Sequence, residues 1–519
     1  MGYLMAIDAG TGSGRAVIFD ESGNQLGVGQ KEWSHHGEDG ISGAMNFDTG
    51  KGWKLICECV KEALLNANIK ASDISAVTST SMREGIVLYD KDGNEIWAVA
   101  NVDSRAGGEV AYLNSTFEGA EEEFYSHSGQ TFALGALPRL LWLKNNKPSV
   151  YEKTKTLTMI DSWVLYRLSG EFGCDPSNGG TTGVFDLKTR NWADWMAQKV
   201  GIKSDIFPKI YEPSSIIGTV TKKAAEESGL TEGTPVVMGG GDVQMGSAGL
   251  GVVECSECAV LGGTFWQQVV NIEAGTVDPS MNLRINPHVV TGLSQAEGIT
   301  FFAGMIMRWF RDSLAKKERD EASAKGVDPY AYLERLAADI PVGSYGIIPI
   351  FSDSMKYKKW IHAAPSFLNL PFDADKMGVA ALFRALEENA AIVSTVNLEE
   401  IMRFSGAKPE KIVFAGGAAK GFLWPQILAD ATGITVKTPV VKEATSLGAA
   451  FAAGTGVGIY SSISDGAKNL VKWDKEFIPN PANKPIYDEA KTNWQNAYSK
   501  MLQLVNEKAV APMWKAPGL

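Results

Sequence analysis

The sequence predicts an α/β fold divided into two domains, on three observations. The chain has 519 residues, and a single hydrophobic core stops growing well below that length, so two large domains with a cleft between them are expected. Segments with a strand pattern alternate with segments of helical periodicity. A strand, a glycine turn with threonine and a second strand occur at residues 3–20 and, as a weaker echo, at 258–270. This repeat indicates two similarly built domains.

The first half opens on strands and then continues into a helix. Apolar runs at residues 3–8 and 15–20 and a third segment ending near Trp33 are separated by Gly-rich turns, which predicts an antiparallel meander. Residues 49–66 carry apolar side chains at helical spacing, and residues 74–82 return as a strand.

The second half begins again with strands. A strand over residues 234–241 ends in glycines, and strands at 259–264 and 265–270 follow. We place the domain division at 247/248, so that residues 1–247 form the first domain and 248–519 the second. The later elements expected are helices at 300–316, 379–404 and 421–432, with a strand at 411–417 entering a glycine turn.

Composition narrows the classes of function. The formal net charge is -11, and no basic patch interrupts it, so nucleic acid and anionic membrane surfaces are not expected partners. No apolar run has the length of a membrane span, and a strand rather than a signal-peptide core opens the chain, so we expect a cytosolic protein. The five cysteines suit a reducing compartment, and neither the lone Cys255-x-x-Cys258 nor the histidines show metal-ligand spacing.

Two glycine hairpins are candidates for phosphate binding. Asp8-Ala-Gly-Thr11, with Arg15 after it, places a carboxylate at a strand end before a tight turn whose N–H groups and hydroxyl can face phosphate oxygens. Leu261-Gly-Gly-Thr264 supplies a second such turn, and Gly416-Gly417 a third close approach before a helix. Each alone is compatible with a structural turn, but together they favour a clamp for a polyphosphate.

Asp242 is the candidate general base. It follows an apolar strand and the flexible Gly239-Gly-Gly241, where a carboxylate can meet a substrate hydroxyl. The alternative is an aspartate that caps the next helix.

These residues together resemble the FGGY family of carbohydrate kinases, nearly end to end. The resemblance is carried by Asp8-x-Gly-Thr11, Gly241-Asp242, Gly263-Thr264, Phe414-Ala-Gly-Gly417 and Glu443-Ala-Thr-Ser-Leu-Gly-Ala-Ala450. It implies two actin-like, RNase-H-like (ASKHA) domains, each a mixed sheet flanked by helices. They would close over ATP, Mg²⁺ and a small hydroxylated substrate, with ATP in the interdomain cleft.

The resemblance also implies roles for individual residues. Asp242 would be the base, and Asp8 and Asp242 the carboxylates near the metal. ATP and phosphate contacts would come from Thr11, Gly12, Arg15, Gly263, Thr264, Gly416, Gly417, Ala418 and Glu443. Substrate contacts would come from Arg83, Glu84, Asp103, Asp242, Trp266 and Gln267, although a core position for Trp266 is an open alternative because a strand buries every second residue.

Further stretches resemble one branch of that family more closely. They include Thr80–Tyr89, Val260–Val270, His362–Phe367 and Trp514–Leu519. The branch implies phosphorylation of (S)-4,5-dihydroxypentane-2,3-dione on its terminal hydroxyl. A kinase of another pentulose or polyol, such as xylulose, ribulose or glycerol, and a non-catalytic actin-like ATP-binding switch remain as alternatives. A base at Asp242 and the pair Arg83-Glu84 favour an enzyme with a hydroxylated acceptor over the switch.

Overall fold

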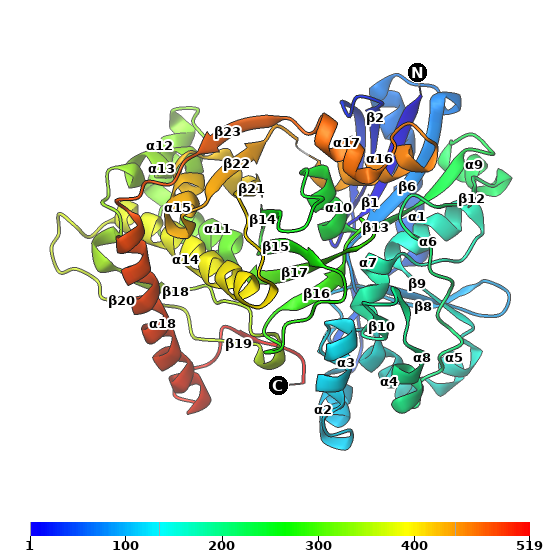
Figure 1. Cartoon of the computed structure of the whole chain (residues 1–519), viewed down its shortest axis with the longest axis horizontal. Coiled ribbons are helices and arrows are strands. Elements are labelled where there is room, and N and C mark those ends of the chain that lie inside the picture. The colour runs from blue at the N-terminus through cyan, green and yellow to red at the C-terminus, as the bar shows by residue number, and fades with distance from the viewer. Residues whose placement is uncertain (1, 134, 442, 519) are drawn as a thin grey trace.

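The computed structural model describes residues 2–133, 135–441 and 443–518. Figure 1 shows two α/β domains side by side, each with helices packed on a central sheet. The predicted α/β class and the two domains are therefore confirmed.

The first domain is built on a mixed six-stranded sheet in the order β12-β13-β6-β1-β2-β3. The expected antiparallel meander is β1-β2-β3, whereas β6 pairs with β1, and β13 with β6, in parallel. The strands are β1 (Tyr3–Ala9), β2 (Ser13–Asp20), β3 (Gln25–Glu32), β6 (Ile74–Ser81), β12 (Ile216–Thr219) and β13 (Pro235–Gly241).

Helices cover both faces of this sheet. The β1 residues Met5 and Ile7 belong to the core formed with α1 (Thr49–Ala67), while Leu4 and Ala6 face the core formed with α16 (Ala444–Gly456). α6 (Ile160–Ser169) also packs on this sheet, while α9 (Lys222–Ser228) packs against α1 and α6, and α17 (Ile463–Leu470) against α16.

A smaller sheet and its helices extend the first domain. Its strand order is β4-β5-β8-β7-β9, and apolar residues of these strands share a core with the neighbouring helices. The elements are β4 (His36–Glu38), β5 (Ile41–Asn46), β7 (Ile86–Tyr89), β8 (Glu95–Val99), β9 (Thr156–Met159), α2 (Gly107–Thr116), α3 (Ala120–Ser128), α4 (Ala136–Asn146), α5 (Pro148–Lys153), α7 (Pro176–Gly179), β10 (Phe185–Asp186), β11 (Asn191–Trp192) and α8 (Asp194–Lys199).

The second domain has a seven-stranded sheet in the order β16-β17-β15-β14-β21-β22-β23. Its strands are β14 (Cys258–Gly262), β15 (Trp266–Glu273), β16 (Arg284–Pro287), β17 (Leu293–Thr300), β21 (Lys411–Gly416), β22 (Thr435–Pro439) and β23 (Trp473–Phe477). One face packs on α14 (Val379–Ser405) and α15 (Leu423–Thr432), and the other on apolar residues of α10 (Asp242–Gly249). Outer elements are α11 (Ala303–Ser313), α12 (Lys316–Ala324), α13 (Pro329–Ala338), β18 (Ile348–Ile350), β19 (Ile361–His362), β20 (Ser366–Leu368), α18 (Lys484–Asn506) and β24 (Trp514–Lys515).

Glycines let α10 and α16 cross closely between the two sheets. A Cβ on Gly448 would lie 1.9 Å from the Met245 carbonyl oxygen, and one on Gly249 would lie 1.9 Å from the Ala444 carbonyl oxygen. α16 thus lies late in the chain but packs against the first sheet. The division at 247/248 stays a prediction, and it assigns α16 to the second domain.

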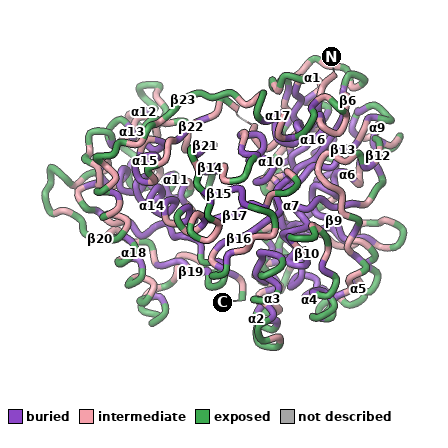
Figure 2. The backbone as a smooth tube through the Cα atoms, viewed as in Figure 1, coloured by how far each residue is buried: buried purple, intermediate pink, exposed green. Residues whose placement is uncertain are grey.

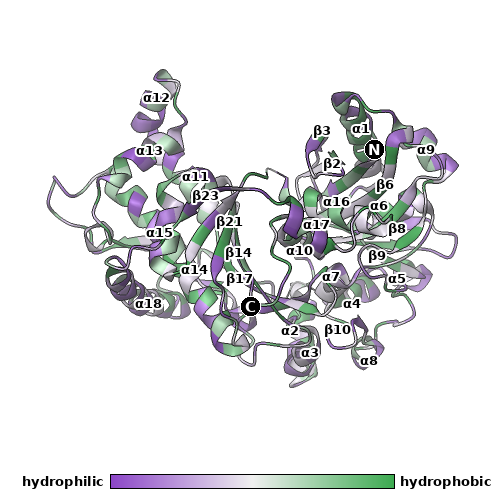
Figure 3. Cartoon of the chain, turned by 45° about the horizontal axis from the view of Figure 1, so that its top comes forward, coloured by the Kyte–Doolittle hydropathy of each residue, from purple (hydrophilic) through white to green (hydrophobic). Residues whose placement is uncertain are grey.

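Burial and hydropathy follow this architecture. Figure 2 shows the strands of both central sheets mostly buried, with exposed segments at the outer helices and loops. Figure 3 shows hydrophobic strands, while outer helices such as α12 and α18 carry hydrophilic residues. Among the described residues, we find no helix whose length and hydropathy would let it cross a membrane.

Candidate active site

Three parallel strands of the first sheet bring the candidate residues to one edge. Because β1, β6 and β13 run in the same direction, their carboxyl ends lie together. Asp8 is next to the end of β1, Arg83 and Glu84 follow β6, and Asp242 follows β13. The topology therefore gathers four residues from three segments that are far apart in sequence.

The β1–β2 hairpin contains a chain of ion pairs. Asp8 lies opposite Arg15 in the strand register, and the Arg15 Nε is 3.6 Å from the Asp8 Oδ2. The Arg15 Nη1 donates to the Glu443 Oε2 at 2.6 Å, which ties the hairpin to the start of α16. Burial raises the pKa of Asp8 to about 7 against the lowering effect of Arg15, and the charges of Asp242 and Glu443 raise it further. The hairpin base therefore carries more negative charge than Arg15 offsets.

The tip of this hairpin is held by side chains but stays open. The Asn101 Nδ2 donates to the Thr11 Oγ1 at 3.0 Å, and the Trp33 Nε1 donates to the Thr11 carbonyl oxygen at 3.1 Å. A Cβ on Gly12 would meet no atom within 4 Å. Thr11 and Gly12 are thus fixed in place beside open space.

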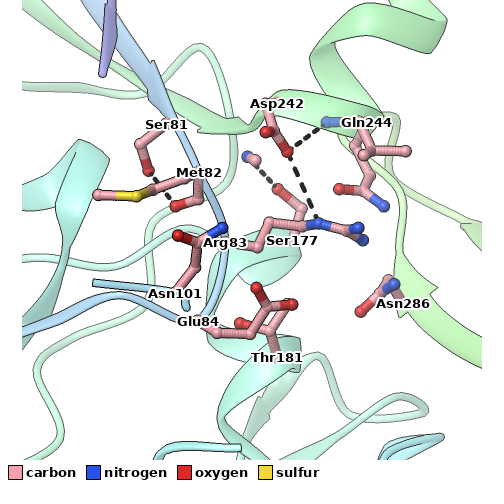
Figure 4. Close-up of polar contacts among 12 residues, drawn as sticks. Ser81, Met82, Arg83, Glu84, Asn101, Ser177, Thr181, Asp242, Gln244 and Asn286 are labelled. Atoms are coloured by element: carbon pink, nitrogen blue, oxygen red, sulfur yellow. Dashed lines mark hydrogen bonds and ion pairs between the residues drawn. The ribbon is translucent and has the colours of Figure 1, made fainter. Parts of the chain in front are cut away.

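Asp242 is the first residue of α10, and Gly241 rather than Asp242 is the N-cap. Its Oδ1 accepts a hydrogen bond from the Val243 N–H at 2.8 Å. It also lies 3.6 Å from the Arg83 Nε, and Figure 4 draws this contact between Asp242 and Arg83 as a dashed line. Burial raises the pKa of Asp242 to about 6, while Arg83 lowers it. A carboxylate with this pKa is ionised at neutral pH but basic enough to accept a proton, which suits a general base.

Arg83 and Glu84 pair with two strands of the second domain. The Arg83 Nη1 and Nη2 donate to the Glu297 carboxylate at 2.6 and 2.9 Å. Glu84 forms an ion pair with Arg284 and adopts a positive φ of 64°. The two pairs link the end of β6 to β17 and β16. They leave Arg83 only 6% and Glu84 only 8% exposed, so both charges are already compensated within the protein.

Further polar side chains surround Arg83. Figure 4 shows Asn101, Thr181, Gln244 and Asn286 gathered around it, from different segments of the chain. Among the described residues, the buried Asn101 Oδ1 and Gln244 Oε1 have no hydrogen-bond partner. Such unpaired acceptors are costly to bury unless a ligand hydroxyl or water reaches them. They are sites to which an acceptor molecule could donate hydrogen bonds.

A buried acidic network supports the turn before Asp242. The Gly241 N–H donates to the Ser177 Oγ at 2.8 Å, and Ser177 in turn donates to the Asp175 carboxylate. Asp161 lies beside Asp175, and burial together with this second carboxyl raises the pKa of Asp161 well above its ordinary value. The network fixes the backbone on which Asp242 stands.

The second hairpin opens on a pocket in the second domain. The pocket has a volume of about 730 Å³, and its glycine-rich wall is lined by Gly262, Gly263, Thr264, Gly417 and Ala418. Gly416 borders this wall, because β14 and β21 pair at Gly262 and Gly416. Its φ is +99°, and a Cβ there would lie 2.6 Å from the Gly262 carbonyl oxygen, so this close approach requires glycine.

The structure corrects the expected positions of two substrate residues. The Asp103 carboxylate is fully buried and accepts hydrogen bonds from the Arg105 Nε at 2.8 Å and the Met45 N–H at 2.7 Å. Trp266 is 0% exposed and packs against Phe414 and Trp424. Both side chains therefore lie in the interior rather than on an exposed substrate wall, although the buried Asp103 Oδ1 and Trp266 Nε1 have no hydrogen-bond partner among the described residues. Gln267, the next residue of the alternating strand, is half-buried.

The candidates therefore fall into two groups. Asp8, Arg15, Arg83, Glu84, Asp242 and Glu443 form the charged group at the edge of the first sheet. Gly263, Thr264, Gly417 and Ala418 line the pocket of the second domain. Sequence reasoning missed Arg284 and Glu297, which carry no local motif and meet Glu84 and Arg83 only through tertiary folding. It also missed Asn101, although this residue stands in the same stretch as Asp103.

The charged group supplies some, but not all, of the ligands that a divalent cation needs. Within residues 2–133, 135–441 and 443–518 no cluster of three or more His, Cys, Asp or Glu side chains could hold a metal ion. The charge of Asp242 contributes to the raised pKa of Asp8, but the two carboxylates do not form a closed metal cage. Two carboxylates with open positions match Mg²⁺, which commonly completes its shell with phosphate oxygens and water.

Comparison with protein families gives a match in both halves. Residues 3–249 match the N-terminal domain, and residues 275–457 the C-terminal domain, of a family described as the FGGY family of carbohydrate kinases. The autoinducer-2 kinase of Yersinia enterocolitica is 55% identical over 518 residues, covering 100% of this chain and 98% of the relative. The autoinducer-2 kinase of Salmonella paratyphi B is 54% identical over the same shares of both chains.

Solved structures share the fold at lower identity. A xylulose kinase from Rhodospirillum rubrum superposes with a TM-score of 0.84 at 22% identity, covering 97% of this chain and 100% of that one. A Plasmodium falciparum glycerol kinase with ADP gives a TM-score of 0.82 at 19% identity, covering 97% and 98%. These likenesses confirm the expected actin-like two-domain fold.

Proposed function

Because this chain belongs to the FGGY family of carbohydrate kinases, we propose that it phosphorylates autoinducer-2, (S)-4,5-dihydroxypentane-2,3-dione. The γ-phosphoryl group of ATP is transferred to the C5 hydroxyl, and the products are phospho-autoinducer-2 and ADP. The observation that carries the choice of substrate is the 55% identity to autoinducer-2 kinases along the whole chain. The xylulose and glycerol kinases, at 22% and 19% identity, support the fold alone.

Asp242 acts as the general base in this proposal. Its carboxylate accepts the proton of the C5 hydroxyl while that oxygen attacks the γ-phosphorus, and the bond from the γ-phosphorus to the β–γ bridging oxygen breaks. The pKa of Asp242, although raised to about 6, still lies below neutral pH, so the carboxylate is mostly ionised and more basic than an ordinary aspartate. Most of the remaining catalysis comes from positioning and from groups that stabilise the transferring charge.

The nucleotide occupies the pocket of the second domain. Gly263, Thr264, Gly416, Gly417 and Ala418 offer backbone N–H groups and little side-chain bulk, which suits close contact with phosphates. Thr11 and Gly12 contact the γ-phosphate from the first hairpin. Arg15 and Glu443 form an ion pair at the base of that hairpin, so they orient it.

Asp8 and Asp242 are the residues that would hold Mg²⁺. The pKa of Asp8, raised to about 7 by burial and by neighbouring carboxylates, marks a position where a cation relieves an excess of negative charge. When bound, Mg²⁺ neutralises charge on the β- and γ-phosphate oxygens.

The acceptor contacts Arg83, Glu84 and Gln267. Arg83 and Glu84 use most of their hydrogen-bonding capacity on Glu297 and Arg284. Asn101 and Gln244 have unpaired buried acceptor atoms among the described residues, so we add them to the acceptor site. A substrate rich in hydroxyls can donate to these oxygens. We also propose that the enzyme works in the cytoplasm, where ATP is available.

ADP release with a panel of acceptors tests the proposal. The purified protein is assayed with ATP and Mg²⁺ on the dihydroxypentanedione, xylulose, ribulose and glycerol, and kcat/KM is compared. We expect the dihydroxypentanedione to give the highest value and omission of Mg²⁺ to stop turnover. Equal turnover of xylulose or glycerol would contradict the choice of substrate, and ADP release unaffected by any acceptor would favour an ATP-hydrolysing switch.

A further inference from the structure

The pocket of the second domain has a wall opposite in character to its glycine turns. Tyr330 and Glu334 of α13, Phe383 and Glu387 of α14, and Trp424 of α15 line it. Aromatic and apolar side chains with a few polar atoms are typical of a site for a flat heterocycle. This wall therefore has the composition of a base-binding surface.

One polar atom on this wall lacks a partner. Glu387 is 1% exposed, and within the part of the chain that the structure describes its Oε2 makes no hydrogen bond. The backbone around it is fixed, because the Trp424 Nε1 donates to the Glu387 carbonyl oxygen at 2.9 Å. A buried carboxyl oxygen without a hydrogen-bond partner destabilises the protein, so its position at the pocket wall points to a ligand that supplies the partner.

Two neighbouring glutamates show what a structural role looks like here. Glu334 accepts a hydrogen bond from the Phe422 N–H at 3.1 Å at the start of α15. Glu388 accepts from the Gly343 N–H at 3.0 Å, the Ser344 Oγ at 2.7 Å and the Arg384 Nε at 3.0 Å. Both are satisfied within the protein, whereas the Glu387 Oε2 is not.

The charge state of Glu387 determines whether its side chain can donate a hydrogen bond or only accept one. Burial raises the pKa of Glu387 well above its ordinary value, and the carboxyls of Glu334 and Glu388 raise it further, against the lowering effect of Arg384. A neutral carboxyl has one O–H donor, which an ionised carboxylate lacks. Ring nitrogens of adenine are acceptors and need such a donor.

We infer that the side chain of Glu387 donates a hydrogen bond to a ring nitrogen of the adenine base. This makes Glu387 a specificity residue for the nucleotide, and the inference rests on the proposed use of ATP. It predicts that the wild type binds an ATP analogue with C–H in place of that nitrogen more weakly than ATP. A variant whose residue 387 cannot donate a hydrogen bond should bind ATP and the analogue equally.

The test is a thermodynamic cycle, in which the binding free energy is compared after changing the side chain, the ligand atom, or both. Dissociation constants are measured by calorimetry for ATP and for 1-deaza-, 3-deaza- and 7-deaza-ATP. The proteins are the wild type, Glu387→Met and Glu387→Gln. Methionine has a similar length without a donor, and the glutamine amide keeps a donor. Thermal unfolding of each variant, and binding of inorganic tripolyphosphate, verify that the fold and the phosphate end are intact.

In the wild type, we expect one deaza analogue to bind about 10- to 100-fold more weakly than ATP. Glu387→Met should bind ATP and that analogue equally, while Glu387→Gln should keep the difference, because coupled partners are non-additive. Equal discrimination by wild type and Glu387→Met would overturn the inference. Coupling to the 6-amino group alone, tested with purine riboside triphosphate, would overturn the donor role. A wild type that binds no ATP would instead contradict the proposed function.

Discussion

The two glycine hairpins share a sequence pattern but lie in opposite chemical environments. The first, between β1 and β2, is braced by the charged chain Asp8–Arg15–Glu443. The second, between β14 and β15, borders a pocket whose adjacent wall is built from glycines and Ala418. The same strand–turn–strand unit is thus surrounded by ion-paired side chains in the first domain. In the second domain it leaves glycine backbone exposed to a pocket. Substitutions should therefore fail in different ways in the two places.

The largest effect on the rate is expected for Asp242, in the charged group at the edge of the first sheet. Asp242→Asn keeps the size of the side chain but removes the proton acceptor, and general-base catalysis is commonly worth about 10²- to 10⁴-fold in rate. We expect kcat for phosphoryl transfer to fall by at least about 10²-fold, with the melting temperature unchanged. Steady-state kinetics and thermal unfolding on the same preparation check this. A helix-capping role would leave the rate unchanged, because Asn caps as well as Asp.

The second prediction concerns the ion pairs that brace Arg83. Arg83→Ala leaves Glu297, whose side chain is 0% exposed, buried without its partner. Breaking such a pair typically costs about 3–5 kcal/mol of the free energy of unfolding. Urea unfolding of Arg83→Ala and of Arg83→Ala/Glu297→Gln measures this, and the double variant should regain part of the loss.

Acceptor kinetics then separate the two roles of Arg83. If Arg83 contacts the acceptor, the double variant folds well but keeps a raised acceptor KM. Full recovery of acceptor KM in the double variant would show that Arg83 only braces the domains.

The third prediction concerns the glycine turn at Gly416, beside the pocket of the second domain. Gly416→Ala forces a side chain onto a φ of +99° and within 2.6 Å of the Gly262 carbonyl oxygen, a strain of about 1–3 kcal/mol. Gly417→Ala is the matched control for stability, since a Cβ there meets no atom within 4 Å. We expect a lower melting temperature and weaker ATP binding for Gly416→Ala. Equal melting temperatures of the two variants would contradict this account of the turn.

The fourth prediction is a dependence of stability on pH. Burial raises the pKa of Asp8 to about 7, so the folded protein binds this proton more tightly than the unfolded chain. The contribution of Asp8 to stability therefore falls as pH rises from about 4 to 7. Asn at this position does not titrate, so Asp8→Asn should gain stability relative to wild type over that range, by about 1.4 kcal/mol per pH unit. Urea unfolding at pH 5 and pH 8, without Mg²⁺, is the measurement, and an opposite trend would contradict the charge excess.

The fold was largely predictable because its signals are local. The helix expected at 379–404 is α14 (Val379–Ser405), and the strand expected at 411–417 is β21 (Lys411–Gly416). The helix has a long pattern of helical spacing, and the strand is a short apolar run that ends in glycines. The helix expected at 300–316 starts later, at Ala303, because Thr300 is the last residue of β17.

The partners within the site were not predictable from local patterns. Arg83 meets Glu297 across 214 positions of sequence, and no motif marks that glutamate. The face of β15 was also ambiguous, since alternation fixes that Trp266 and Gln267 point to opposite sides but not which side is the core. Asp103 was expected to contact the substrate, and no local pattern indicated that its carboxylate would pair with Arg105 in the interior.

The central claim is that the first hairpin's surroundings perform chemistry while the second hairpin's surroundings hold the nucleotide. The most direct measurement determines both kcat and the ATP dissociation constant for Asp242→Asn and Gly416→Ala. The account predicts a crossed pattern. Asp242→Asn should lose at least about 10²-fold in kcat, with only a modest rise in the ATP dissociation constant from its role toward Mg²⁺, whereas Gly416→Ala should mainly weaken ATP binding. Near wild-type turnover by a folded Asp242→Asn protein, or a larger loss of ATP binding in Asp242→Asn than in Gly416→Ala, would contradict it.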